Sequence, residues 1–460
     1  MSGFRLPDGL ELVCSGCGLV VAEPTVVACP ANRHDGTPDD IDHRLEIPDF
    51  AVTETARALG PPTLLEDANP FVAFRHRFYS YALARRLGLS DDDYVGIVVA
   101  LDAAVAEVDG QGFIRTPLTE EAELARACGL ADGVRLWVKD ETGNVSGSHK
   151  ARHLMGVMVH QRVLEMAGCA PPRPPLLAIS SCGNAALGAA VVARAAGRSL
   201  AVFVPEWVAG STRDRLVALG AEVHVCSRQS GELGDPCHHG FRAALADGAL
   251  AFATQGSENA LTLEGGATIG YELAGSLSAL DAVFVQVGGG ALAASVALGL
   301  RRARHHGEGD RLAALWAVQS ASMHPLQRAL RRAIALILPE VRSGRPIAEL
   351  VDEALNRLAR QRTQAMTPWP TEPQSVASGI LDDETYDWRP LVRAILASSG
   401  GLVLATEDHF TRANDLARRH TSSNVDHTGT AGLAGLMARN EGGHLDPGNV
   451  VVLFTGAARG

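Results

Sequence analysis

Lysine is scarce in this chain, and the two lysines that it has are the first candidates for chemistry. Of 41 lysines and arginines among 460 residues, only Lys139 and Lys150 are lysines. A guanidinium group stays protonated, whereas a lysine amine can lose its proton and attack a carbonyl carbon. Compositional drift could leave two lysines by chance, so the residues around them decide between chance and chemistry.

Lys150 ends a loop of small and polar residues, KDETGNVSGSHK (139–150), and stands where a helix is expected to begin. Glycines in this loop let the backbone turn sharply. A helix N-terminus favours a nearby anion and lowers the pKa of an amine. The loop therefore suits a lysine that holds a phosphate-bearing aldehyde as an imine. For Asp140 and Glu141, the acidic residues of this loop, we expect helix-start or surface roles.

A run of three glycines before another expected helix is a candidate phosphate site. Without side chains, the backbone N–H groups of such a run can converge on a phosphate. The run is not a G-x-G-x-x-G pattern with a suitably placed acidic residue, so we do not expect a dinucleotide site. The residues of this candidate loop are Gly288, Gly289, Gly290, Ala291 and Leu292.

Two further loops place polar side chains at expected strand ends. The segment SSCGNAALG (180–188) puts Asn184 at a turn into a helix, which taken alone is an ordinary connection. Thr455 follows the last apolar run, where a buried hydroxyl most often has a structural role. Together with the lysine loop and the glycine loop, these positions make four candidate loops.

Apolar runs that alternate with helical stretches must position these loops. Runs with so little polar alternation are typical of parallel strands buried on both faces, so we predict an α/β fold. In open parallel sheets, ligands lie beyond the carboxyl ends of the strands, which is where the four loops fall. The predicted strands are 136–140, 176–180, 199–206, 222–226, 249–254, 282–290, 312–320 and 449–456.

Lysine, amide, glycine-rich loop and hydroxyl, in this order on a parallel α/β chain, resemble the pyridoxal-phosphate enzymes of fold type II. That group includes threonine synthase, threonine and serine dehydratases, and the β subunit of tryptophan synthase. The resemblance covers about residues 111–460. It extends to segments that link the loops, namely VPEWVAGSTRDRLVALGAEV (204–223), NALTLEGGATIGYEL (259–273), SVASGI (375–380), DHTGTAGLAGL (426–436) and VVVLFTG (450–456).

The resemblance implies two open, mostly parallel α/β domains with the cofactor in the cleft between them. The large domain, which binds pyridoxal phosphate, would comprise 111–157 and 251–460, with a helical insertion at about 301–370. The small, mobile domain would comprise 158–250. Residues 1–110 would form an N-terminal extension, with helices around 71–89 and 91–108.

The resemblance also implies a role for each candidate residue. Lys150 would bind the cofactor and then move the α-proton of the substrate. Asn184 would hydrogen-bond the phenolic oxygen of the cofactor, and Thr455 would contact the pyridine nitrogen. The phosphate would be held by the glycine loop (288–292), and His149 could contact it as well. The expected substrate-binding residues are Ser148, Ser180, Ser181 and Gly183.

The type of reaction follows from Thr455 in this reading. A neutral hydroxyl does not keep the pyridine nitrogen protonated as an aspartate would, which favours loss of a substituent over transamination. We therefore expect a lyase or synthase that removes the α-proton and a β or γ substituent from a hydroxy- or phospho-amino acid, similar to threonine synthase or threonine dehydratase. A histidine directly before the lysine, as at His149, resembles the sequence of the tryptophan synthase β subunit, so β-replacement stays open. The alternative of another class is a protein that binds the cofactor without turnover.

Three cysteines near the N-terminus raise the question of a metal. Cys14 and Cys17 form a C-x-x-C pair, and Cys29 follows. A zinc site needs a fourth thiolate or imidazole, and the nearest substitute is His34. We assign no metal here and favour a plain loop, with zinc left open.

Composition sets the remaining expectations. The formal net charge of −11, with no long basic run, argues against a nucleic-acid partner. Eight irregularly spaced cysteines suit a reducing cytosol, and no secretory signal is recognisable. Residues 281–300 read as a strand, a glycine turn and a helix rather than a membrane span. We expect a soluble, cytoplasmic protein, and the resemblance implies a homodimer that acts on a small amino acid.

Overall fold

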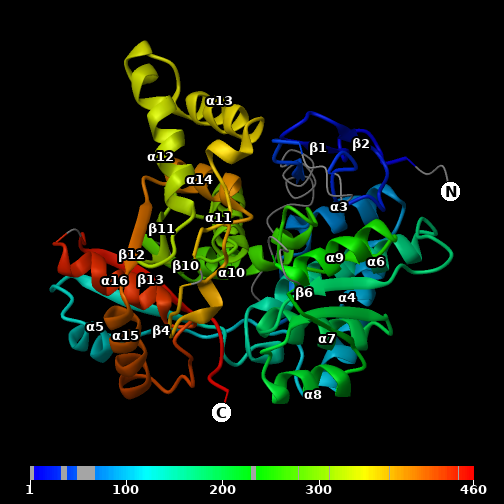
Figure 1. The fold of residues 1–460 in the computed structure, drawn as a ribbon, viewed down its shortest axis with the longest axis horizontal. Coiled ribbons are helices and arrows are strands. Elements are labelled where there is room, and N and C mark those ends of the chain that lie inside the picture. Colours follow the sequence, from blue (N-terminus) through cyan, green and yellow to red (C-terminus); the bar gives the residue numbers. More distant parts are fainter. Residues whose placement is uncertain are drawn as a thin grey trace.

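The computed structural model describes residues 5–32, 39–48, 68–228, 235–277, 279–309, 311–371, 373–443 and 445–459. These residues form two α/β lobes, each around its own sheet, with an N-terminal ribbon over one lobe and a helical arm on the other (Figure 1). All the apolar runs predicted as strands are strands in the structure.

The larger lobe is built on a six-stranded sheet in the order β12-β11-β10-β13-β5-β4. All neighbours are parallel except β4, which is antiparallel to β5 at one edge. The aliphatic residues of the central strands are buried on both faces, as their uninterrupted apolar runs predict. The strands are β4 (Leu118–Glu120), β5 (Val134–Asp140), β10 (Ala282–Gln286), β11 (Ala314–Ser320), β12 (Gly401–Ala405) and β13 (Gly448–Phe454).

Helices cover both faces of this sheet and form two apolar layers with it. One layer contains α5 (Ala122–Ala127), α15 (Glu407–His420) and α16 (Ala431–Glu441). The opposite layer contains α10 (Thr262–Ser276), α11 (Ala291–His305) and α14 (Trp388–Ala397). The sheet is thus closed off from water except at its ends and edges.

The smaller lobe has a four-stranded parallel sheet in the order β8-β7-β6-β9. Its core is continuous with that of the N-terminal helices. Its strands are β6 (Leu177–Ser180), β7 (Leu200–Pro205), β8 (Glu222–Cys226) and β9 (Leu250–Ala251). Its helices are α6 (Lys150–Met166), α7 (Asn184–Ala195), α8 (Gly210–Ala218) and α9 (Pro236–Ala246).

The N-terminal extension contains both strands and helices. The helices predicted around 71–89 and 91–108 are confirmed as α2 (Pro70–Ala73), α3 (Tyr79–Arg86) and α4 (Asp91–Asp109), with a 3₁₀ turn η1 (Arg75–Arg77) between the first two. The sequence analysis did not foresee the antiparallel sheet β2-β1-β3 that precedes them. Its strands are β1 (Leu12–Cys14), β2 (Val20–Val21) and β3 (Leu45–Glu46), too short to show any periodicity.

The helical arm begins later than the predicted range 301–370. Strand β11 lies within that range and pairs with β10 and β12, so it belongs to the large sheet. Arginine-rich helices on both sides of this strand hid the boundary. The arm itself comprises α12 (Leu326–Ile337), η3 (Leu338–Ser343), α13 (Ile347–Ala359) and η4 (Arg362–Gln364), and Figure 1 shows α12 and α13 reaching beyond the sheet.

The segment 281–300 is the predicted strand, glycine turn and helix, namely β10 and the start of α11. Within the described ranges, no helix combines the length and the apolar character that a membrane crossing requires.

Candidate active site

Three of the four candidate loops leave neighbouring strands of the large sheet. Strand β13 lies between β10 and β5, and all three run parallel. Phe454 pairs with Asp140, and Val452 pairs with Phe284. The lysine loop, the glycine loop and Thr455 therefore emerge side by side at the carboxyl edge of the sheet, as expected for an open parallel sheet.

The lysine loop is fixed to the end of β13. Its backbone is tightly turned, because Ser146 has a φ of 58° and Gly147 a φ of 70°. Ser148 forms an isolated β-bridge with Gly456, and the N–H of His149 donates to the carbonyl oxygen of Thr455 at 3.3 Å. A left-handed conformation at a serine is costly, and the contacts to β13 hold it in place. Helix α6 then begins at Lys150.

Glu141 does not have the helix-start or surface role that the sequence predicts. Its side chain is fully buried and forms a bidentate ion pair with Arg152, with Nε–Oε2 and Nη2–Oε1 distances of 2.8 and 3.0 Å. Arg152 also pairs with Glu272, which pairs with Lys139. Burial alone would raise the pKa of Glu141, but Arg152 and Lys139 lower it. Lys139, the other lysine of the chain, is thus part of a buried ionic network beneath the lysine loop.

Lys150 faces two carboxylates from a segment that follows the helical arm. Burial lowers the pKa of its amine, and Asp382 and Asp387 oppose that shift. A lowered pKa increases the fraction of neutral amine, which is the nucleophilic form. The sequence analysis did not identify either aspartate, although both follow the segment SVASGI (375–380) closely.

The glycine loop is covered by the same segment. Gly290 has a φ of 95°, and a Cβ there would come within 3.0 Å of Thr385. The N–H of Gly289 donates to Oδ2 of Asp382 at 2.7 Å, and the N–H of Asp387 donates to the carbonyl oxygen of Gly289 at 2.8 Å. One backbone N–H of the glycine loop therefore donates to a carboxylate of its own chain. Ala291 and Leu292 form the first turn of α11 and are buried.

Thr455 is held by a side chain of β10. The Nε2 amide of Gln286 donates to the Thr455 hydroxyl at 2.6 Å, and to the carbonyl oxygen of Gly429 at 3.0 Å. Because the amide occupies an acceptor position of the hydroxyl, the hydroxyl proton is free to point to another acceptor. Gln286 was not identified from the sequence, where it is one polar residue in an apolar strand.

His149 is buried and has one unpartnered nitrogen. Its Nδ1 lies 3.1 Å from the carbonyl oxygen of Thr455, so Nδ1 carries the proton. Its Nε2 has no hydrogen-bond partner among the described residues. Burial, followed by the charge of Lys150, lowers the pKa of His149 well below its usual value. Nε2 of the neutral ring is therefore an acceptor, and it could donate to a phosphate only after the ring is protonated.

The fourth loop joins this group from the smaller lobe. Asn184 is the first residue of α7, and a Cβ on Gly456 would come within 2.8 Å of its Nδ2. Only a glycine at 456 lets the amide approach so closely. The structure thus brings Asn184 next to Gly456, the residue after Thr455.

The predicted substrate-binding residues fall into two groups. Ser180, Ser181 and Gly183 are half-buried where β6 ends and α7 begins, and α7 offers free backbone N–H groups there. Ser148 is fully buried, and its hydroxyl lies 3.4 Å from the backbone nitrogen of Lys150. It supports the lysine loop, whereas the other three face the end of the smaller sheet.

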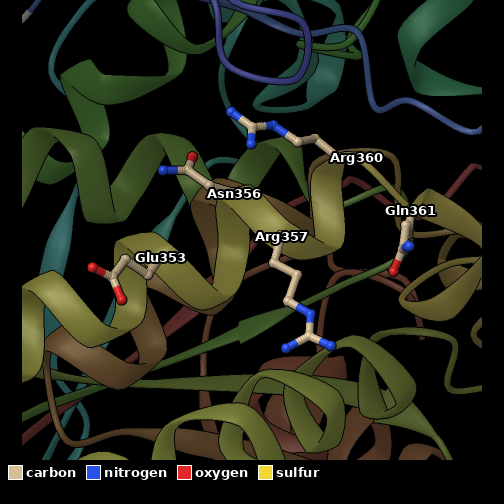
Figure 2. A pocket seen from close by; sticks show the side chains of 5 residues that line it. All are labelled: Glu353, Asn356, Arg357, Arg360 and Gln361. Atoms are coloured by element: carbon tan, nitrogen blue, oxygen red, sulfur yellow. The ribbon is translucent and has the colours of Figure 1, made fainter.

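A separate hollow lies on the helical arm. Its volume is about 470 Å³, and Figure 2 shows that the lining side chains come from the C-terminal half of α13 and from the two residues that follow it, Arg360 and Gln361. None of the residues predicted to bind cofactor or substrate lines it. The lining residues are Glu353, Asn356, Arg357, Arg360 and Gln361.

Comparison with known proteins gives an independent finding. A family model described as "Pyridoxal-phosphate dependent enzyme" matches residues 110–456. The chain is 28% identical over 305 residues to "Serine dehydratase-like" of Mus musculus, which covers 65% of this chain and 86% of that relative. It is 27% identical over 234 residues to "L-serine dehydratase/L-threonine deaminase" of Mus musculus, which covers 50% of this chain and 64% of that relative.

A solved structure shares the fold. The processed form of threonine deaminase isoform 2 from Solanum lycopersicum matches with a TM-score of 0.57 and 19% identity, covering 81% of this chain and 91% of that one. At this level of identity, the likeness concerns the architecture alone. It confirms the predicted fold class of mostly parallel α/β sheets.

Proposed function

The chain belongs to the family of pyridoxal-phosphate dependent enzymes, and on this premise we propose that it is a lyase that eliminates the β-hydroxyl group of a hydroxy-amino acid such as serine or threonine. The observation that carries the proposal is the meeting of Lys150, the glycine loop and Thr455 at the ends of adjacent strands. The names of the curated relatives, a serine dehydratase-like protein and a serine dehydratase/threonine deaminase, support this reaction over others.

The residues of the site fit pyridoxal phosphate. Lys150 supplies a half-buried amine of lowered pKa for the aldehyde, and the glycine loop supplies backbone donors for the phosphate. The unpartnered Nε2 of His149 fits the same role, because a phosphate dianion favours the protonated ring. Asp382 holds the N–H of Gly289 in the structure, so its carboxylate must give up this contact or become protonated when phosphate binds.

When bound, pyridoxal phosphate serves as a sink for the electron pair left at Cα after the α-proton is removed. The Nζ atom of Lys150 takes this proton from Cα. The same ammonium can then protonate the hydroxyl oxygen on the β carbon, so that water leaves. Hydrolysis of the resulting unsaturated amine yields a 2-oxo acid and ammonia.

Thr455 favours elimination over transamination in this proposal. Its hydroxyl accepts from Gln286 and keeps its own proton for the pyridine nitrogen. A neutral donor of this kind would leave the bound ring without a full positive charge, so the ring would stabilise negative charge at Cα less strongly. Loss of the neighbouring hydroxyl then competes well with protonation elsewhere.

The start of α7 is where we propose that the substrate carboxylate binds. Ser180, Ser181 and Gly183 lie at this helix N-terminus, whose free N–H groups favour an anion. Asn184 at the same turn would contact the phenolic oxygen of the cofactor. These assignments rest on the resemblance and on the placement of the loops.

β-Replacement is the second candidate, and His149 before the lysine favours it. In that case a nucleophile would add where the hydroxyl leaves, as the resemblance to the tryptophan synthase β subunit implies. A threonine synthase activity on a phospho-amino acid is a finer variant of the same chemistry. Both differ from dehydration in what is released.

The test is a product assay on the purified full-length protein with pyridoxal phosphate. We expect L-serine or L-threonine to give a 2-oxo acid and ammonia. Release of phosphate from O-phospho-L-homoserine without a 2-oxo acid would point to a synthase, and consumption of serine only with an added nucleophile would point to replacement. Cofactor binding without any product would overturn the proposal and leave a binding protein.

The scarcity of lysine gives a sharp control. Borohydride reduction links the cofactor to the lysine that binds it, and only two lysine side chains can carry the label. We expect the label on Lys150 and none on Lys139, whose amine is held by Glu272 and by the carbonyl oxygen of Thr116. A label on Lys139 would contradict the assigned site.

Two finer predictions concern the oligomeric state, which the resemblance implies, and the compartment, which the cysteines suggest. We propose a homodimer and a reducing, cytosolic setting, which the free thiols of all eight cysteines suit. Light scattering after size exclusion checks the first, and a mass twice that of the 48.3 kDa chain is expected.

A further inference from the structure

Three thiols and an imidazole meet in the N-terminal ribbon. Cys14 ends β1, Cys17 lies in the turn before β2, Cys29 follows β2, and His43 precedes β3. One potential ligand atom from each residue lies within 4.8 Å of the other three. The sequence analysis assigned no metal here because it found no fourth ligand beside Cys29. His34, its nearest substitute, lies outside the described residues.

Three of the six distances between the ligand atoms are close to the edges of a tetrahedron around a metal ion, and all six are within 4.8 Å. The Sγ atoms of Cys17 and Cys29 are 3.8 Å apart, and Nδ1 of His43 lies 3.5 Å from the Cys29 Sγ and 3.8 Å from the Cys14 Sγ. Zinc bonds of about 2.3 Å to sulfur and about 2.0 Å to nitrogen give tetrahedral edges of roughly 3.8 and 3.5 Å. A disulfide would bring two sulfurs to about 2.05 Å, so these thiols are not paired with one another.

An aspartate orients the imidazole toward the thiols. Both carboxylate oxygens of Asp39 lie 3.1 Å from Nε2 of His43. The carboxylate accepts the Nε2 proton, which leaves the lone pair of Nδ1 directed at the sulfurs. A carboxylate that holds a histidine in this tautomer is the usual outer partner of a zinc-bound imidazole. The contact between Asp39 and His43 is an observation independent of the cysteine cluster, and it too indicates a zinc ion.

The local backbone is shaped for this geometry. Gly18 has a φ of 79°, and its N–H donates to the carbonyl oxygen of Cys14 at 2.8 Å, which closes the turn between the first two cysteines. A Cβ on Gly16 would come within 2.8 Å of the Ile41 side chain, so a larger residue there would push away the chain that leads to His43. The turn that carries Cys14 and Cys17 therefore packs closely against the segment that carries His43, and Gly16 permits this contact.

We propose that Cys14, Cys17, Cys29 and His43 bind one structural zinc ion. Three sulfurs and one nitrogen in a tetrahedron favour zinc over calcium or magnesium, which prefer oxygen ligands. All four positions of the ion are filled by protein, so the site is closed and does not bind substrate. The described residues of the ribbon form three short strands, and a metal stabilises a module that is too small for a core of its own.

The zinc would also support the glycine loop (288–292) through Arg44, the residue after His43. Arg44, adjacent to His43, forms a buried ion pair with Asp387. The N–H of Asp387 in turn donates to the carbonyl oxygen of Gly289. Arg44 is therefore a positioning residue, and this second consequence rests on the proposed function, whereas zinc binding itself does not.

The test is metal analysis of the full-length protein, purified under reducing conditions from zinc-containing medium. We expect about one zinc ion per chain by inductively coupled plasma mass spectrometry. Replacement by cobalt should give the visible bands of a tetrahedral ion and a sulfur-to-metal charge-transfer band in the near ultraviolet. Cys17→Ser and His43→Ala should lose most of the bound zinc. Cys17 is the exposed member of the cluster, so its substitution should leave the two α/β lobes folded, which circular dichroism verifies.

Cys128→Ser is the matched control. This half-buried cysteine lies at the end of α5, far along the chain from the cluster, and its variant should retain full zinc content. Absence of zinc in the wild-type protein, with no uptake of added zinc by the reduced protein, would overturn the proposal. So would full zinc content in Cys17→Ser, or a Cys17–Cys29 disulfide in freshly isolated protein. All these readouts are independent of substrate, so failure of the proposed reaction would not affect them.

Discussion

The Nε2 amide of Gln286 donates a 2.6 Å hydrogen bond to the hydroxyl of Thr455, and thereby determines where that hydroxyl can donate. Gln286 ends β10 and Thr455 follows β13, which are parallel neighbours in the large sheet. The two residues are 169 positions apart in the chain. Sheet pairing alone brings them together, and it turns a single hydroxyl into an oriented donor.

Thr455→Val should weaken the cofactor site without filling or emptying space. The variant removes the proposed donor to the pyridine nitrogen, and loss of one hydrogen bond of about 1 kcal/mol corresponds to roughly a fivefold loss of affinity. Titration of the unloaded protein with pyridoxal phosphate measures it. Thr455→Ser keeps the hydroxyl and should bind nearly as tightly as the wild type. Equal affinity of the valine and threonine forms would show that the hydroxyl does not contact the cofactor.

The rate of cofactor capture by the unloaded protein should rise with pH and then level off below the ordinary pKa of a lysine. Only the neutral amine of Lys150 attacks the aldehyde, and burial lowers the pKa of this amine. The neutral fraction therefore grows as pH rises through the lowered pKa, and is complete at a pH where an exposed lysine is still protonated. Stopped-flow capture rates across this range measure it. A rate that rises only near the ordinary lysine pKa would exclude a perturbed amine.

Asp382→Asn should speed capture at low pH. Asp382 raises the pKa of Lys150, so its removal moves the rise in rate to lower pH, and a shift of one pKa unit changes the rate there about tenfold. The substitution also removes a negative charge from the N–H of Gly289, where phosphate is expected. The same stopped-flow assay compares variant and wild type. Slower capture in Asp382→Asn would show that the carboxylate assists binding.

Arg152→Met should destabilise the protein strongly. The change leaves Glu141 without its bidentate partner and removes one partner of Glu272, and breaking a buried ion pair in this way costs about 3–5 kcal/mol. The lowered pKa of Glu141 means that the network stabilises the fold above the pKa of an unfolded glutamate, and this contribution is lost as pH falls through the folded value. Thermal unfolding at neutral pH, followed by circular dichroism, measures the loss.

Arg412→Met provides the comparison for the buried network. Arg412 pairs with Asp408 and Glu441 on the surface of α15 and α16, where solvent screens the charges. Its removal should hardly change the melting temperature. Similar melting temperatures for both variants would contradict the importance of the buried network.

Much of the architecture could be predicted from local sequence. Long apolar runs such as those of β10 and β13 are strands because uninterrupted Val, Leu and Phe suit a sheet covered on both faces. The helix over 91–108 begins at Ser90 with a capping box to Asp93 and ends at Gly110 in a left-handed conformation. β1 to β3 escaped notice because two or three residues cannot show a period.

The order of the chemical residues along the chain was likewise readable. Lys150, the glycine loop and Thr455 stand at strand ends, and the family model matches the range that the resemblance covered. The burial of Glu141 could not be predicted from the sequence, because its partner Arg152 lies across the lysine loop. Asp382 was not readable either, because it reaches Gly289 across 93 positions.

The sequence by itself determined the family, the parallel sheets and the lysine that can bind an aldehyde. These depend on local pattern, on residue type and on order, all of which are present in the unfolded chain. The tertiary structure alone decided that Gln286 orients Thr455, that Asp382 holds the glycine loop, and that His43 completes the cysteine cluster. Each of these contacts joins residues far apart in the chain. Their approach depends on strand order and packing, which hydrophobic periodicity does not encode.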